Sequence, residues 1–270
     1  MNSRPTPHKK TKSKVVINAD DFGYSEGINS VIYDAISRGC ISSATIMANG
    51  PAVDEAIAIA AGFPEVSFGV HLNLTEFSPL LPSLTNSTSG LVDGNHQFLG
   101  QEFRKLRPSP QLLEVCYQEL NQQLLSVHQK GLRPSHLDSH HHIHTIPWLL
   151  PVIWQLQKKY KIFHLRNTLN VYSFPESGFR QFRLMIAKKL WNSASRFLGS
   201  KMTERFSSLQ TFLENPLRPE FVYASSIELM CHPGQTGFEA ETQQLLAKGK
   251  LFLPDNFHLV NYAQAFEINR

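Results

Sequence analysis

The sequence contains little cysteine. Its three cysteines, Cys40, Cys116 and Cys231, are far apart and form no Cys-x-x-Cys pair. An odd, scattered set of this kind argues against a disulfide framework and against a zinc site built from cysteines. Free cysteines fit a reducing compartment, and we therefore predict a cytoplasmic location.

Two further absences concern membranes and nucleic acids. No apolar run approaches the roughly 20 residues that cross a bilayer as a helix, so we expect no membrane span. The basic residues 1–14 are not followed by the apolar core of a signal peptide, and we interpret residues 1–13 as a disordered tail. The net charge of +4 comes largely from this tail and from a basic run at residues 180–205, which is too local to indicate nucleic-acid binding.

What is present is a regular alternation of short apolar segments with amphipathic ones along 270 residues. Strands are predicted at residues 15–17, 45–48, 67–74, 136–144, 162–165 and 225–230. Helices are predicted at residues 25–39, 53–61, 111–130 and 147–159, with two more around 180–197. Such alternation is typical of a parallel sheet wrapped by helices. We predict one α/β domain at residues 14–270, a (β/α) barrel that contains a long loop at 75–108 and a variable region at 167–219.

Ionisable side chains are most concentrated in the tract from His136 to His144. It holds five histidines, at positions 136, 140, 141, 142 and 144, and the carboxylate of Asp138. If the whole tract is extended, His136, Asp138, His140, His142 and His144 point to one side. A row of ionisable groups on one face of a core strand is costly unless something binds it. We therefore expect a metal ion there.

Other polar residues also lie in or just after predicted strands: the pair Asp20-Asp21, His71 and His232. In a β/α barrel the carboxyl ends of the strands form one rim, where residues distant in sequence meet. Two histidines and a carboxylate on a divalent ion leave positions open for water and substrate, which indicates a hydrolytic site. A second, adjacent carboxylate can then serve as general base.

These residues leave three functions open. The first is hydrolysis at one metal ion. The second is a phosphoesterase, which commonly uses two ions, and His142 and His144 would be available for the second one. The third is a non-catalytic sugar-binding or scaffold protein, although such a protein needs no base beside its metal ligand.

Four motifs, in order along the chain, resemble those of the YdjC-like carbohydrate deacetylases, the family of chitooligosaccharide deacetylase, which also has hopanoid-associated relatives. They are Asn18-Ala19-Asp20-Asp21-Phe22-Gly23, Gly69-Val70-His71-Leu72-Asn73-Leu74-Thr75, the tract His136-Leu137-Asp138-Ser139-His140-His141-His142-Ile143-His144, and Met230-Cys231-His232-Pro233-Gly234. The aromatic-glycine segment that the family usually carries late in the barrel is not reproduced at residues 203–211.

The resemblance implies a distorted TIM-like barrel that removes the N-acetyl group from an acetylated amino sugar or oligosaccharide, with a metal-bound water attacking the amide carbonyl. It implies one divalent ion, Mg²⁺ or Zn²⁺, on Asp21, His71 and His140. It implies Asp20 as general base, and His232 is our candidate acid for the leaving amine. The residues expected to orient ligands or contact substrate are His136, Asp138, His142, His144 and Arg166. The expected partner is a small carbohydrate, and the sequence leaves homo-oligomerisation open.

Overall fold

A computed structural model describes residues 12–84, 90–171, 179–248 and 253–267. The strands are β1 (Ser13–Phe22), β2 (Ser43–Ile46), β3 (Ser67–Leu72), β4 (His136–Ser139), β5 (His164–Leu165), β6 (Arg205–Ser208), β7 (Ser226–Cys231) and β8 (Phe257–Leu259). The α-helices are α1 (Glu26–Ser37), α2 (Val53–Ala61), α4 (Pro110–Gln129), α5 (Leu150–Tyr160), α6 (Phe179–Phe197), α7 (Leu209–Glu214), α8 (Pro219–Val222), α9 (Glu239–Lys248) and α10 (Tyr262–Ala265). Short 3₁₀ helices lie at Gly100–Lys105, His140–Thr145 and Pro147–Leu149.

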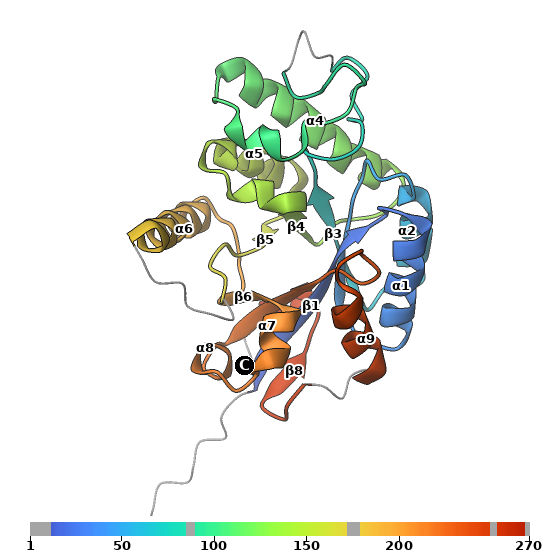
Figure 1. Ribbon diagram of the computed structural model, residues 1–270, viewed down its shortest axis with the longest axis vertical. Coiled ribbons are helices and arrows are strands. Elements are labelled where there is room, and N and C mark those ends of the chain that lie inside the picture. Colours follow the sequence, from blue (N-terminus) through green and yellow to red (C-terminus); the bar gives the residue numbers. More distant parts are fainter. Residues whose placement is uncertain (1–11, 85–89, 172–178, 249–252, 268–270) are drawn as a thin grey trace, which may run out of the picture.

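The strands form one sheet in the order β5-β4-β3-β2-β1-β7-β6, and β8 pairs with the start of β1. Every strand pair in the described residues is parallel. The two ends of this order approach each other through isolated parallel bridges, His164 with Lys201 and Asn170 with Phe206. The sheet therefore curves into a barrel that closes irregularly (Figure 1), and the predicted distorted TIM-like α/β fold is confirmed.

Helix α1 shows how the local sequence sets the element boundaries. The Ser25 side chain accepts a hydrogen bond from the Ile28 backbone N–H, which caps the first turn. Ile28, Ile32 and Ile36 are buried on one face, as the predicted apolar stripe requires. Gly39 follows with φ at 63°, a left-handed value that glycine adopts without strain.

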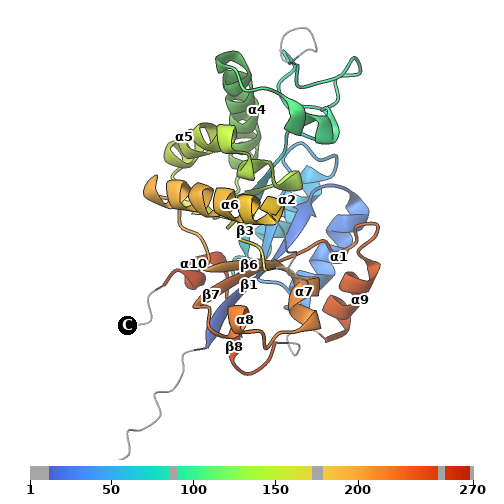
Figure 2. The same cartoon turned by 60° about the vertical axis from the view of Figure 1, so that its left-hand side comes forward.

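The helices cover the outside of the sheet. Helices α1 and α2 lie together on the β1–β2 side, and α4 and α5 lie together beyond β3 and β4 (Figures 1 and 2). The apolar face of α4, with Leu120, Leu124 and Val127 fully buried, packs toward this core. Among the described residues, no helix combines the length and apolar character needed to cross a membrane.

Several predicted boundaries differ from the structure. Strand β4 ends at Ser139, so the extended conformation predicted as far as His144 is wrong. Residues 180–197 form one helix instead of two, and β6, α7 and α8 follow within the region left without a pattern. Ser13 already belongs to β1, whereas residues 1–11 of the predicted disordered tail lie outside the described residues.

Candidate metal and catalytic site

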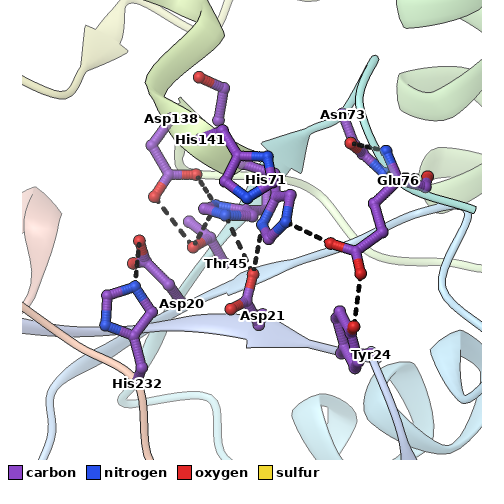
Figure 3. Close-up of polar contacts among 12 residues, drawn as sticks. Asp20, Asp21, Tyr24, Thr45, His71, Asn73, Glu76, Asp138, His141 and His232 are labelled. Atoms are coloured by element: carbon purple, nitrogen blue, oxygen red, sulfur yellow. Dashed lines mark hydrogen bonds and ion pairs between the residues drawn. The ribbon is translucent and has the colours of Figure 1, made fainter. Parts of the chain in front are cut away.

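The carboxyl ends of β1, β3 and β4 bring Asp21, His71 and His140 together. Figure 3 shows Asp21 and His71 side by side. Asp21 Oδ1 lies 3.3 Å from His71 Nε2 and 2.9 Å from His140 Nδ1. Ligand atoms held at about 2.1 Å by one tetrahedral zinc-like ion are about 3.4 Å apart. The three predicted ligands thus present one oxygen and two nitrogens at spacings that fit a single divalent ion.

Hydrogen bonds on the far side of each ring decide which nitrogen faces the centre. Asp138 Oδ1 lies 2.8 Å from His71 Nδ1. Glu76 Oε2 lies 2.7 Å from His140 Nε2. Because a carboxylate only accepts, each of these nitrogens carries a proton, and the opposite nitrogen of each ring, which faces Asp21, is the one that would offer its lone pair to a bound cation. This is the arrangement that metal-binding histidines use.

The backbone around the centre is strained in a way that aims the ligands. Asp21 has φ at 64°, in the left-handed region that non-glycine residues seldom occupy. A register shift between Ala19 and Phe22 accompanies it at the end of β1. As a result the neighbouring side chains of Asp20 and Asp21 both line the pocket instead of pointing to opposite faces of the sheet.

Asp20 is held by a buried arginine. Arg166 Nη2 donates to Asp20 Oδ1 at 2.6 Å, and Nη1 donates to Oδ2 at 2.7 Å. Asn18 Nδ2 also donates to Oδ1, at 2.8 Å, so Oδ1 has two donors and Oδ2 has one among the described residues. A carboxylate oxygen has two acceptor positions, and Oδ2 therefore keeps one for another donor.

Arg166 ties several carboxylates together. Its Nη2 lies 2.8 Å from Asp138 Oδ2, and its Nε donates to Glu228 Oε1 at 2.7 Å. Arg166 is fully buried, and its contacts hold Asp20 and Asp138 in place. That it orients these residues stays a prediction.

The charges of the pocket favour a bound cation. Burial by itself lowers the pKa of His71, but the Asp138 and Asp20 carboxylates outweigh burial and raise the pKa to about 10. Burial would raise the pKa of Asp20, yet Arg166 holds it well below its usual value. The same surplus of carboxylates that holds a proton on His71 would stabilise a divalent ion beside it.

His232 stands across the pocket from the ligand cluster. Its Nε2 lies 3.9 Å from Asp20 Oδ2, and its ring packs against Phe238 with centroids 4.3 Å apart. Its backbone N–H donates to Glu241 Oε1 at 2.7 Å, which fixes the turn after β7. Burial lowers the pKa of His232 despite the nearby Asp20 and Asp21 charges.

The remaining histidines of the tract separate because the chain turns after Ser139. His141 and His142 have φ at 51° and 53°, so alternation along a strand stops there. His142 lines the pocket, and burial followed by the Arg166 charge lowers its pKa to about 3. His144 is buried beside the Ser139 hydroxyl, with Nδ1 2.5 Å from Oγ, and does not line the pocket. The structure thus places His144 outside the pocket, and its predicted role is not supported by this position.

His136 also lies away from the pocket. Its ring stacks on Tyr262 with centroids 3.7 Å apart, and its Nε2 lies 3.2 Å from Asn18 Oδ1. It occupies the space above Gly69, where an added Cβ would lie 2.7 Å from the imidazole. His136 is thus a hydrogen-bonded core histidine, one layer below the site, and this position does not support the role predicted for it.

Sequence reasoning missed several polar residues of the site. Glu76 follows β3 on a turn that Asn73 stabilises, because Asn73 Oδ1 accepts from the Glu76 backbone N–H at 3.1 Å. Glu76 also accepts a hydrogen bond from the Tyr24 hydroxyl at 2.5 Å. Gln235 Nε2 donates to Asp21 Oδ2 at 2.9 Å, one residue beyond the Cys-His-Pro-Gly motif. The polar residues Asn73, Thr75 and Glu76, which follow β3, were the feature of the sequence that could have indicated Glu76 as a site residue.

The pocket above these residues has a volume of about 360 Å³. Its walls contain the ligand cluster, Asp20, His232 and the aromatic rings of Tyr24 and Phe238. The pocket thus combines charged side chains with an aromatic side, and its size is that of a small-molecule site. Among the described residues, no group of three candidate ligand atoms includes His142 or His144, so the second ion considered for them has no support.

The chain is similar to several known proteins. A carbohydrate deacetylase of Halalkalibacterium halodurans is 33% identical over 224 residues, which cover 82% of this chain and 84% of that protein. A carbohydrate deacetylase of Geobacillus stearothermophilus is 39% identical over 149 residues, covering 54% of this chain and 57% of that protein. The solved structure of a candidate cellobiose-phosphate cleavage protein of Enterococcus faecalis V583 has the same fold, with a TM-score of 0.72, 24% identity and coverage of 94% and 99% of the two chains. Residues 14–258 match the YdjC-like protein family, and the chain belongs to that family.

Proposed function

We propose that this protein is a metal-dependent carbohydrate deacetylase, which hydrolyses the N-acetyl group of an acetylated amino sugar to give acetate and a free amine. The supporting observation is the cluster of Asp21 Oδ1, His71 Nε2 and His140 Nδ1, with the Asp20 carboxylate beside it in the same pocket. Relatives that are named carbohydrate deacetylases support the substrate class.

The three ligand residues would hold one divalent ion, Mg²⁺ or Zn²⁺. Such an ion, when bound, lowers the pKa of water and polarises a carbonyl oxygen. Asp138 and Glu76 would keep the lone pairs of His71 Nε2 and His140 Nδ1 directed at it.

The chain's own groups would handle the protons. Water adds its oxygen to the acetyl carbonyl carbon, and Asp20 Oδ2, which has an acceptor position left, takes the proton that water loses. When the carbon–nitrogen bond breaks, the amine nitrogen needs a proton, because an amide anion is a very poor leaving group. His232 Nε2, 3.9 Å from Asp20 Oδ2, would receive the proton that Asp20 took from water and deliver it to the amine, which returns both side chains to their starting state.

Release of free acetate is the direct test of this function. Purified protein, freed of metal and then reconstituted with one divalent ion at a time, is incubated with a panel of N-acetylated sugars. We expect acetate and amine in equal amounts only with metal present. A protein that binds the metal and the sugars but releases no acetate would be a sugar-binding protein instead.

Glu76→Ala is expected to weaken metal binding by about 10- to 100-fold, since removal of the carboxylate that orients a metal-binding histidine has effects of this size. Glu76 holds the His140 ring with Nε2 at 2.7 Å. Calorimetric titration of the metal-free protein measures the affinity. Glu102→Ala, an exposed acid of the same long loop, is the matched control and should leave the affinity unchanged. Equal affinities in the two variants would remove Glu76 from the metal site.

His232→Ala is expected to damage amide hydrolysis much more than ester hydrolysis. An aryl acetate expels a phenolate, which needs no proton, whereas a sugar amide expels an amine, which does. The ratio of kcat/KM for an N-acetyl sugar to that for an aryl acetate should fall on the order of 10²-fold. If both activities fall together, or if only KM for the sugar rises, His232 positions substrate and is not the acid.

A further inference from the structure

Helix α6 carries large apolar side chains on its solvent side. Phe182, Leu190 and Phe197 are 55%, 66% and 91% exposed. At 3.6 residues per turn, Phe182, Ile186, Leu190 and Phe197 fall within an arc of about 80°. We call these four residues the α6 stripe. A stripe of this kind on a soluble domain marks a surface that something else covers.

The opposite face of α6 fixes the helix to the barrel. Asn192 Nδ2 donates to Asn167 Oδ1 at 2.7 Å, and the buried Trp191 packs edge-on against His144. Around Trp191 and Asn192 the inward side is therefore occupied by polar and aromatic contacts. In the first turns of the helix Leu184 and Met185, outside the α6 stripe, are also 45% and 40% exposed, so the apolar surface is widest there. The C-terminal half of α6 is thus anchored to the barrel, and among the described residues the α6 stripe is an outward feature.

The charge of α6 is entirely of one sign. Its 19 residues contain five cations, Arg180, Arg183, Lys188, Lys189 and Arg196, and no acid. Arg183 and Lys189 are exposed at the two sides of the α6 stripe. A second copy packed through the same helix by two-fold symmetry would bring these cations together, which is unfavourable. An anionic partner is favoured instead.

We infer that α6 is a peripheral docking surface for an anionic membrane, with the α6 stripe entering the interface and exposed cations such as Lys189 binding lipid phosphates. An apolar arc bordered by Lys and Arg, on a helix that does not span the bilayer, is the pattern of an interfacial helix. The basic run at residues 180–205 would thus serve membrane binding and not the hydrolytic reaction.

Helix α6 contacts the chain segment at the active-site end of the barrel. Thr168, two residues beyond Arg166, donates its hydroxyl hydrogen to the Lys188 carbonyl at 3.2 Å. Lys188 Nζ also donates to Asn170 Oδ1 at 3.1 Å. The exposed half of α6 thus lies beside the segment that leaves β5 at the rim where the metal ligands meet. Docking through it would hold that rim near the membrane.

Cosedimentation of the full chain with lipid vesicles tests this inference without reference to the reaction. Binding is expected to vesicles with about 30% phosphatidylglycerol in phosphatidylcholine, not to pure phosphatidylcholine, and it should weaken as salt is added. Leu190→Gln should reduce partitioning on the order of tenfold, because it removes an inserted apolar side chain while keeping a good helix former. Lys189→Gln should reduce it about fivefold.

Leu217→Gln is the matched control, because Leu217 is 64% exposed but lies outside α6. It should bind vesicles like the unmodified protein. Ile186→Gln serves as a second stripe variant, and thermal melting shows that each variant is folded. Equal binding by the stripe variants and the control overturns the inference, as does equal binding to neutral and anionic vesicles. A dimer that dissociates on Leu190→Gln, with no vesicle binding, would assign the α6 stripe to a second copy.

Discussion

Replacing His71 with alanine is expected to abolish stoichiometric metal binding, with at least about a 10²-fold loss of affinity. His71 supplies one of three ligand atoms, and two remaining protein donors hold a divalent ion poorly. The loss should be larger than for Glu76→Ala, which only orients a ligand. Asp21→Ala and His140→Ala should behave like His71→Ala. Metal content after equilibrium dialysis, measured by elemental analysis, gives the result directly.

His142→Ala is the control for this experiment, since His142 lines the same pocket but belongs to no ligand group in the described residues. It should keep one ion per chain. Full metal content in His71→Ala would show that the ligand set is wrong. Two ions per chain in the unmodified protein would favour a phosphoesterase, and the group formed by Glu76, His140 and His141 would be the place to look for the second ion.

The fold could be predicted to the extent that each element carries its own pattern. The apolar run before Asn18 and the capped, striped helix from Ser25 to Gly39 are local signals. The helix forms where expected, and the strand forms but extends from Ser13 to Phe22, beyond the predicted residues 15–17. The closure of the barrel could not be predicted in the same way. Strand β5 has only two residues, and the barrel closes through single bridges such as His164 with Lys201, which leave no periodic pattern.

For the site, too, some features could be predicted from the sequence and others could not. Asp20, Asp21, His71 and His140 were predicted to meet because strand ends converge on one rim, and they do. The prediction of a straight tract was wrong beyond Ser139, because His141 and His142 adopt left-handed φ values that residue type does not reveal.

The places of two other histidines could not be predicted from the tract. His136 and His144 contact Asn18, Tyr262 and Ser139 in the core and lie outside the pocket. Such partners come from other strands or from a turn, and a count of histidines cannot show them. The partner of Glu228, in contrast, could have been predicted from the sequence. A carboxylate inside the apolar strand β7 already implies a buried cation, and Arg166 is that cation.

Asp20→Asn is expected to lower turnover by about 10²- to 10⁴-fold while metal content stays near one ion per chain. The amide cannot take the proton that water loses. Its NH₂ group must also face an Arg166 N–H, because Arg166 donates to both Asp20 oxygens. The substitution therefore disturbs a buried ion pair as well as the base, and steady-state rates, metal content and the melting temperature have to be measured together.

Glu228→Gln separates these two effects. Glu228 is a fully buried carboxylate partner of the same arginine, with Oε1 2.7 Å from Arg166 Nε, but it lies outside the residues that line the pocket. Its variant should lose stability to a similar degree, since a charged hydrogen bond to Arg166 is lost in both cases, yet it should keep most of its turnover.

Equal losses of turnover in the two variants would mean that Asp20 acts only by holding Arg166 in place. Loss of the ion in Asp20→Asn would make Asp20 a ligand and would leave His232 as the candidate base. Proton transfer is assigned to Asp20 Oδ2 only under two conditions. Asp20→Asn must lose most of its turnover while it keeps the ion, and Glu228→Gln must keep its turnover.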